Sequence, residues 1–350
     1  MSDLENALKP MVEQIISEEM KSFDVEGQVR GLLEEVAGKA TRVLEVKLGG
    51  TDGDGVKFPL VHNQFELLLQ IVALGGLNVL LTGGAGLSKS TAVAQVAEAL
   101  GLGLGSISFS NQTTKTDLFG FVDAMGVRRG TAFTDAYENG NLFLGDEQDA
   151  CSANVFVMLN SAIENGFFSL PDGTIVKQHE NFRYVGTANT NLRGAKDGFV
   201  ARNKADAASV DRFVIINWLL DEILEEKITD NSNWLDIVRA CREKAEDELE
   251  GVTITPRSSY QGAKLLKAGI DPELVFQMTV IKGMEKDTEE VLRSSFSNSM
   301  LKRCQQDVGV KKVTEPEAPK KVVELEVEEP IYTDPIEAEE EEFAELDGEW

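Results

Sequence analysis

The sequence predicts an α/β domain with a mostly parallel sheet flanked by helices, followed by a helical second domain. From residue 63 onward, short apolar runs alternate with segments whose apolar residues recur at helical spacing. Short strands that alternate with helices imply a parallel sheet covered on both faces. Residues 219–305 contain no convincing strand and therefore indicate the helical domain. The five candidate strands are NVLLT (78–82), SISFS (106–110), NLFLGD (141–146), FRYVGT (182–187) and FVII (213–216).

Four regions follow from these patterns. Residues 1–60 predict an N-terminal helix and a hairpin, the latter from RVLEVKL and VKFPLV on either side of the turn-rich GGTDGDG. Residues 61–218 form the α/β domain, and residues 219–310 form the helical one. Residues 311–350 combine prolines with acidic runs, a composition that buries too little apolar surface to offset the entropy of ordering. We therefore expect this tail to be disordered.

Composition narrows the class of protein. The chain has 350 residues, 42% of them hydrophobic, and a formal net charge of -26. Such an acidic balance argues against non-specific binding of nucleic acid or anionic membranes. Three isolated cysteines without metal-like spacing fit a reducing compartment. The first residues lack an apolar leader, and the longest apolar stretch is interrupted by Gln70, Gly75, Gly76 and Asn78, so we expect a cytoplasmic protein without a membrane span.

A phosphate-binding loop follows the first strand and opens the next helix. Its glycines allow backbone N–H groups to surround phosphates at a helix N-terminus. Lys89 would reach the β- and γ-phosphates, and the Ser90 hydroxyl would ligate Mg²⁺. Ser88 stands where the motif has glycine, and its side chain would crowd the loop if the backbone needs a positive φ. The candidate nucleotide-binding residues are Gly83, Gly84, Ala85, Gly86, Leu87, Ser88, Lys89, Ser90 and Thr91.

Polar residues end two further strands. Asp146 and Glu147 follow the run NLFLG, and acids at the carboxyl end of a strand lie where α/β folds bind ligands. About fifty residues after the phosphate loop, Asp146 would hold Mg²⁺ and Glu147 would polarise an attacking water. Asn189, after FRYVGTA, is a candidate for orienting the same water. Asp149 is interpreted as the cap or first turn of the following helix.

These motifs resemble the AAA+ ATPases, and within them the MoxR-like and CobS-like branch. The resemblance covers roughly residues 60–285 and is most specific in ENGFFSLPDGTIVKQH, which is similar to the branch's β-hairpin insertion, here near residues 166–181. It implies an α/β domain, a helical lid and a ring of subunits, usually six. It also implies Asn189 as sensor 1, Arg212 in Asp-Arg-Phe as an arginine finger, and Arg257 in Thr-Pro-Arg as sensor 2.

Both arginines have ordinary explanations as well. Arg212 fits either a finger for a neighbouring subunit's γ-phosphate or a salt bridge with Asp211 or another acid. Arg257 follows Pro256 at a helix start, where the positive helix end disfavours a cation unless an anion lies nearby. Two residues depart from the family pattern. Ser88 puts the hydrolysis rate in doubt, and Gly145 replaces a bulky residue and is expected to loosen its strand.

The combined prediction is an ATP-driven homo-oligomeric ring that remodels or loads a protein partner. The resemblance implies a partner with a von Willebrand-type domain, although no residue identifies it. One alternative is an assembly protein that binds nucleotide without turnover, as Ser88 would allow. Another is a nucleic-acid motor, against which stand the charge and the lack of an appended helix-turn-helix or zinc motif.

Overall fold

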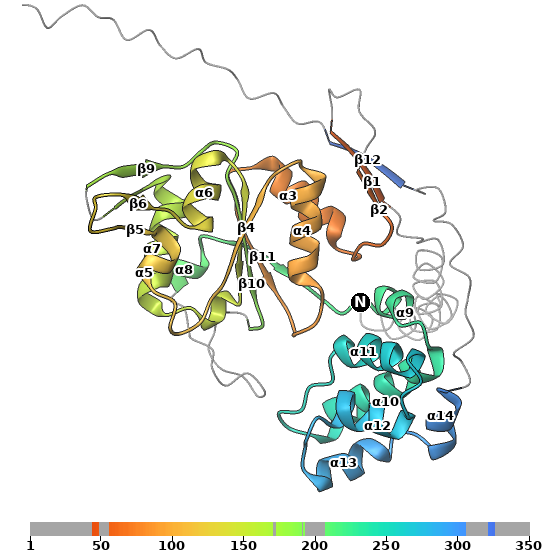
Figure 1. Ribbon diagram of the computed structural model, residues 1–350. Helices are drawn as coiled ribbons and strands as arrows, with labels where there is room; N and C mark the ends of the chain where they lie inside the picture. The colour runs from red at the N-terminus through yellow and green to blue at the C-terminus, as the bar shows by residue number, and fades with distance from the viewer. Residues whose placement is uncertain are drawn as a thin grey trace, which may run out of the picture.

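The structure is a computed structural model that describes residues 44–48, 56–170, 173–190, 192, 207–305 and 321–325. The N-terminal helix predicted within residues 1–60 and most of the acidic tail lie outside the described residues. The N-terminal strands, the α/β domain and the helical domain are all represented (Figure 1).

A five-stranded parallel sheet forms the centre of the α/β domain, as the sequence predicts. Its order is β11-β3-β10-β7-β4, so the strand that precedes the phosphate loop has a neighbour on each side. Every neighbouring pair in this sheet is parallel. The strands are β3 (Asn78–Thr82), β4 (Leu104–Ser108), β7 (Leu142–Asp146), β10 (Arg183–Ala188) and β11 (Val214–Asn217).

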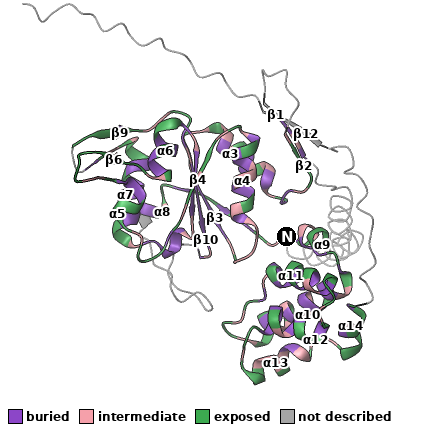
Figure 2. Ribbon diagram, viewed as in Figure 1, coloured by how far each residue is buried: buried purple, intermediate pink, exposed green. Residues whose placement is uncertain are grey.

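Helices cover both faces of this sheet, and alternate strand residues contact opposite layers. In β3, Val79 and Leu81 pack with α3 (Phe65–Leu74) and α4 (Lys89–Ala99). Leu80, between them, packs on the other face with α6 (Ala132–Asn139) and α7 (Ala153–Asn165). Figure 2 shows the central strands buried between helices that are exposed on their outer sides.

Two antiparallel hairpins project from the second helical layer. The first pairs β5 (Phe121–Val122) with β6 (Arg128–Arg129) and follows α5 (Lys115–Phe119). The other pairs β8 (Phe167–Ser169) with β9 (Ile175–Lys177), in the segment where the sequence predicts an insertion. Two short helices, η1 (Gln148–Ala150) and α8 (Ala207–Val210), complete this domain.

The C-terminal domain is helical, with a core of its own around the buried Trp234. Glu225 is buried there and accepts two hydrogen bonds from the Arg242 guanidinium, which joins the first two helices. Among the helices that the structure describes, none is both long and apolar enough to cross a membrane. The elements are α9 (Glu222–Ile228), α10 (Ser232–Glu248), α11 (Pro256–Lys267), α12 (Pro272–Phe276), the π-helical η2 (Gln277–Ile281), α13 (Lys286–Arg293) and α14 (Asn298–Arg303).

A separate three-stranded sheet joins the two ends of the described chain. β1 (Leu44–Leu48) pairs antiparallel with β2 (Val56–Phe58), and Phe58 packs on Phe65 with ring centroids 5.6 Å apart. β12 (Lys321–Leu325) pairs with β1 in parallel. The prediction of a disordered tail is therefore wrong for these five residues. The run KVVEL holds adjacent β-branched valines, which favour a strand once a partner edge is available.

Candidate functional site

The phosphate loop lies where the carboxyl ends of three neighbouring strands meet. β10 lies between β3 and β7, so the residues after all three strands meet at one edge of the sheet. A cavity of about 250 Å³ opens there. Its lining combines residues from the loop, from the ends of β7 and β10, and from α11 of the helical domain. These residues are Ala85, Gly86, Leu87, Ser88, Lys89, Ser90, Thr91, Asp146, Glu147, Asn189, Arg257 and Tyr260.

Two residues of the phosphate loop have a left-handed backbone. Gly86 has a φ of 77° and Ser88 a φ of 62°. Glycine adopts this conformation at little cost, whereas a serine there is disfavoured. The condition under which Ser88 was expected to crowd the loop is therefore met. A Cβ added to Gly86 would lie 3.3 Å from Arg257 Cγ, so the helical domain closely approaches the loop.

Lys89 is the first residue of α4 and is only 7% exposed. Its Nζ donates to the carbonyl oxygens of Gly83 (2.7 Å) and Gly84 (2.8 Å) and to Oδ1 of Asn189 (3.1 Å). Burial lowers the pKa of Lys89 to about 8, and the nearby carboxylates, Asp146 foremost, only partly oppose this shift. The ammonium therefore lacks a counter-charge strong enough to offset its burial, which an anion in the cavity would supply.

The two acids at the end of β7 are held by a threonine on the neighbouring strand. The Thr187 hydroxyl donates to Asp146 Oδ1 and accepts from the backbone N–H of Glu147 at 3.2 Å. The other oxygen of Asp146 accepts from Ser90 Oγ at 3.1 Å. Sequence reasoning missed Thr187, although a hydroxyl residue near the end of an apolar strand, two residues before Asn189, is visible in the sequence. The arrangement places two hard oxygen ligands, those of Ser90 and Asp146, side by side.

Asp149 lies in the first turn of the short helix η1, as one of its two interpretations predicts, and it does not cap the longer helix α7. Helix α7 begins at Ala153, with Ser152 at its N-cap position. Asp149 lies in η1 and is 1% exposed. Its Oδ2 accepts from the backbone N–H groups of Asn189 and Thr190 and from the Thr190 hydroxyl. A local pattern cannot reveal these donors, since they lie forty residues further along the chain.

Gly145 does not loosen β7, contrary to expectation. It pairs in register with Gly186 of β10. A Cβ on Gly145 would overlap the Tyr184 hydroxyl and lie 2.8 Å from the Phe109 ring. Tyr184 in turn donates to Gln148 Oε1 at 3.2 Å. The glycine is therefore required by close packing directly beside the acidic pair.

Trp218 supports the phosphate loop from the segment that leads into the helical domain. Its indole Nε1 donates to the carbonyl oxygen of Leu87 at 2.9 Å. The His62 ring stacks on it with centroids 4.1 Å apart, and His62 Nε2 lies 3.0 Å from the Leu219 carbonyl oxygen. Gln64 also bonds to this segment, through the carbonyl oxygen of Asn217 and the N–H of Leu219. The loop and the start of the helical domain are thus mechanically linked.

The two candidate arginines occupy different places. Arg257 lies at the N-terminal end of α11 and lines the cavity, where it makes no ion pair among the residues that the structure describes. Arg212 does not line the cavity. Its Nε lies 3.0 Å from Glu164 Oε2, and the two side chains are 35% and 51% exposed. The structure therefore brings Arg257 to the site. It places Arg212 in a salt bridge with Glu164, which is one of the two roles that the sequence allowed for this arginine.

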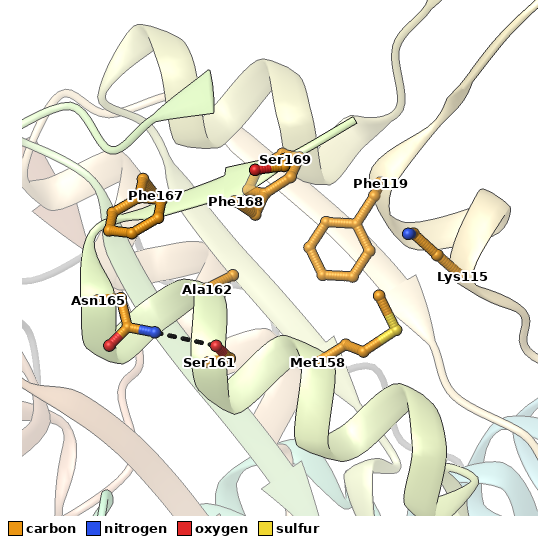
Figure 3. A pocket seen from close by; sticks show the side chains of 9 residues that line it. All are labelled: Lys115, Phe119, Met158, Ser161, Ala162, Asn165, Phe167, Phe168 and Ser169. Carbon is orange, nitrogen blue, oxygen red and sulfur yellow. Dashed lines mark hydrogen bonds between the residues drawn. The ribbon is translucent and has the colours of Figure 1, made fainter. Parts of the chain in front are cut away.

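A second cavity, of about 260 Å³, lies between α5, α7 and β8 (Figure 3). Phe119, Met158 and Phe168 give it an apolar wall, and Lys115 lies at one end. Asn165 and Ser161, one helical turn apart, are joined by a 2.9 Å hydrogen bond. No lining residue is shared with the cavity at the phosphate loop.

Comparisons with known proteins agree with this geometry. Residues 78–213 match the family model of the AAA domain, dynein-related subfamily. The aerobic cobaltochelatase subunit CobS of a Sinorhizobium species is 30% identical over 152 residues, which are 40% of this chain and 46% of that protein. The chain thus spans less than half the length of this curated relative.

Solved structures with a similar arrangement include two bacterial proteins. NtrX of Brucella abortus, in complex with ATP, is 14% identical, with 81% of this chain and 73% of that chain covered and a TM-score of 0.40. A Thermotoga maritima RuvB mutant is 20% identical, with 66% of each chain covered and a TM-score of 0.38. Residues 78–213 are thus similar to the AAA domain of the dynein-related subfamily, and the parallel sheet with its phosphate loop has the arrangement of a P-loop AAA+ fold.

Proposed function

We propose that this protein binds ATP with Mg²⁺ and hydrolyses it as a ring-shaped motor that remodels or loads a protein partner. One observation carries the proposal: Lys89, the Ser90–Asp146 pair, Glu147 and Asn189 converge on one cavity at the carboxyl ends of adjacent strands. P-loop ATPases require a phosphate cradle, metal ligands and a group that activates water at this edge.

When nucleotide binds, the ammonium of Lys89 would exchange hydrogen-bond acceptors. In the free protein its ammonium donates to two loop carbonyls. Phosphate oxygens that enter the loop give it charged acceptors instead, and charge-assisted hydrogen bonds are stronger than bonds to neutral carbonyls. The N–H groups at the start of α4 add a favourable partial charge. Arg257 supplies a further cation from the helical domain, so nucleotide would hold the two domains together.

Ser90 and Asp146 are the residues that would hold Mg²⁺. Their oxygens lie 3.1 Å apart, and hydroxyl and carboxylate oxygens are suited to this ion. When bound, the ion neutralises phosphate charge. Thr187 fixes the other carboxylate oxygen of Asp146, so the Ser90-facing oxygen keeps its direction.

Glu147 is the proposed base that polarises the attacking water. Its backbone has a left-handed φ of 54°, and its N–H is bound to Thr187, so the side chain leaves β7 at a fixed angle. Strained backbone of this kind is common at functional sites. Asn189, which lies on the neighbouring strand end, would orient the same water from the other side.

Arg212 would act on the nucleotide of a neighbouring subunit. Its guanidinium lies outside its own cavity and is partly exposed beside Glu164. A finger supplied by another chain must be exposed in the isolated subunit, and it stabilises charge on the γ-phosphate. This role requires a closed ring, and we propose six subunits by the family resemblance. The Glu164 salt bridge would open when the subunits assemble.

The partner is proposed from the relative that the chain resembles. CobS is named as a subunit of an aerobic cobaltochelatase. By analogy we propose that this ring acts on a protein partner, with a von Willebrand-type domain as the candidate. A second candidate function is nucleotide-dependent assembly with weak or no turnover, which the left-handed Ser88 favours.

Steady-state ATP turnover of the full chain, alongside nucleotide affinity, tests the proposal. We expect wild type to hydrolyse ATP, Glu147→Gln to bind it without hydrolysis, and Lys89→Ala to lose binding. Binding without turnover in wild type would favour the assembly protein instead. Unchanged affinity in Lys89→Ala would reject the site altogether.

A further inference from the structure

Asp149 is a buried carboxylate two residues beyond the proposed base. It is 1% exposed, and a single oxygen, Oδ2, accepts three hydrogen bonds. The donors are the N–H of Asn189 at 3.1 Å, the N–H of Thr190 at 2.9 Å and the Thr190 hydroxyl at 2.9 Å. Three donors on one oxygen match a charged carboxylate, which accepts more strongly than a neutral group.

The residues that Asp149 binds lie directly after β10, which ends at Ala188. Beyond that point the ladder of sheet hydrogen bonds stops, and buried N–H groups need other acceptors. Asp149 provides one acceptor for both N–H groups. At the other end of the same residue, Asn189 Oδ1 lies 3.1 Å from Lys89 Nζ. The Asp149 side chain thus holds the backbone of Asn189, and the side-chain amide of Asn189 contacts Lys89 in the phosphate loop.

We propose that Asp149 is a positioning residue: it holds the loop after β10 so that the Asn189 side chain stays against Lys89 and the proposed γ-phosphate position. The expected effect of Asp149 on the hydrolysis rate rests on the proposed function, whereas its expected effect on the loop after β10 rests on the geometry alone. Asp149 does not itself line the cavity, and it reaches the lining through its hydrogen bond with the N–H of Asn189.

Removing Asp149 in two backgrounds, with and without the Asn189 side chain, separates positioning of Asn189 from general support of the fold. If Asp149 acts through Asn189, removing Asp149 has little further effect once the Asn189 amide is gone. A purely structural carboxylate would instead weaken the protein in either background, and the two losses would add. Misplacement by about 1 Å costs up to about a hundredfold in rate, so a loop released from Asp149 should show a large loss.

The experiment compares kcat, ADP affinity and amide exchange in the full chain. Asp149→Ala should lower kcat on the order of tenfold to a hundredfold while ADP affinity stays within about twofold. The double variant Asp149→Ala/Asn189→Ala should match Asn189→Ala within about twofold. Asp149→Asn keeps the shape and an acceptor oxygen, so it should retain more activity than Asp149→Ala, and it replaces that variant if alanine prevents folding.

Asp271→Ala is the control, because Asp271 also accepts two backbone N–H bonds, from Glu273 and Leu274, but at an exposed helix start in the helical domain. It should leave kcat unchanged.

Hydrogen–deuterium exchange at the end of β10 tests the positioning without any turnover. We expect the Asn189 and Thr190 amides to exchange faster in Asp149→Ala and as in wild type in Asp271→Ala. Unchanged exchange in Asp149→Ala, or additive losses of kcat in the double variant, would overturn the inference. If wild type itself lacks ATPase activity, the proposed function fails, and the exchange result still decides whether Asp149 holds the loop.

Discussion

The buried ammonium of Lys89 makes nucleotide binding depend on pH in a direction that can be worked out. Burial lowers its pKa from 10.5 to about 8 in the free protein. Phosphate oxygens beside the ammonium favour its charged form, so bound nucleotide should return the pKa toward its ordinary value. Between these two values the free protein lacks a proton that the complex holds. Binding above pH 8 should therefore take up a proton.

The size of the effect follows from the shift. At pH 9, a group with a pKa of about 8 is roughly nine-tenths deprotonated when free, so binding should take up about 0.9 proton. Affinity should fall about tenfold per pH unit between pH 8 and 10.5. At pH 7 the same group is already charged, and uptake should be near 0.1 proton, roughly.

The same shift has a sign for the stability of the free protein. The pKa of Lys89 is lower in the folded protein than in the unfolded chain, so the unfolded chain binds more protons between pH 8 and 10.5. The contribution of Lys89 to the free energy of unfolding therefore rises with pH in that window. Below pH 8 the buried charge costs about 3 kcal/mol, to order of magnitude. Lys89→Met should therefore raise the melting temperature of the free protein near pH 7, an increment that shrinks as the pH approaches 10.5.

Titration calorimetry with ADP, in buffers of different ionisation enthalpy, measures the proton uptake directly. Phosphate groups of the nucleotide are already fully ionised at pH 9, so they do not contribute. The matched measurement at pH 7 is the control. Heats at pH 9 that do not depend on the buffer would refute the reasoning, because Lys89 would then not change its protonation on binding.

Two further predictions concern Ser88 and β12. Ser88→Gly should raise ATP turnover, because it removes about 1 kcal/mol of left-handed strain, while the added freedom of unfolded glycine keeps the change in stability below about 1 kcal/mol. Ser88→Ala keeps the Cβ and should gain nothing; a lower rate in the glycine variant would show that the hydroxyl contributes. Deleting residues 313–350 should lower the melting temperature by removing β12 from β1, whereas deleting residues 326–350 should not. Equal melting temperatures for the two truncations would contradict this, and both should still bind nucleotide.

The sheet and the phosphate loop could be predicted because their signals are local. Apolar runs, helical spacing and the glycines of the loop each lie within a few residues, and parallel strands bring the residues at their carboxyl ends together. Thus Lys89, Asp146 and Asn189 could be placed at one edge of the sheet before their contacts were known.

The parts that could not be predicted depend on contacts between distant segments. Asp149 has the local pattern of a cap, and only the position of the loop after β10 shows which N–H groups it binds. β12 lies in an acidic tail whose average composition favours disorder, and its partner β1 lies more than 270 residues earlier. The reason for a glycine at position 145 becomes clear only from the position of Tyr184 on the next strand. Each case is set by tertiary packing that overrides local preference.

Mixing two inactive variants tests the central claim, a site completed by two subunits. Glu147→Gln and Arg212→Ala should each bind nucleotide and fail to hydrolyse it, since the finger is worth on the order of a thousandfold or more in rate. Lys267→Ala, which removes an exposed cation paired with Asp230 in the helical domain, should behave as wild type.

In an equal mixture with random assembly, about a quarter of the interfaces pair an intact Glu147 with an intact Arg212, and we predict that activity returns in proportion. An Arg212→Ala protein that hydrolyses ATP alone, or a co-assembled mixture that stays inactive, would contradict the shared site.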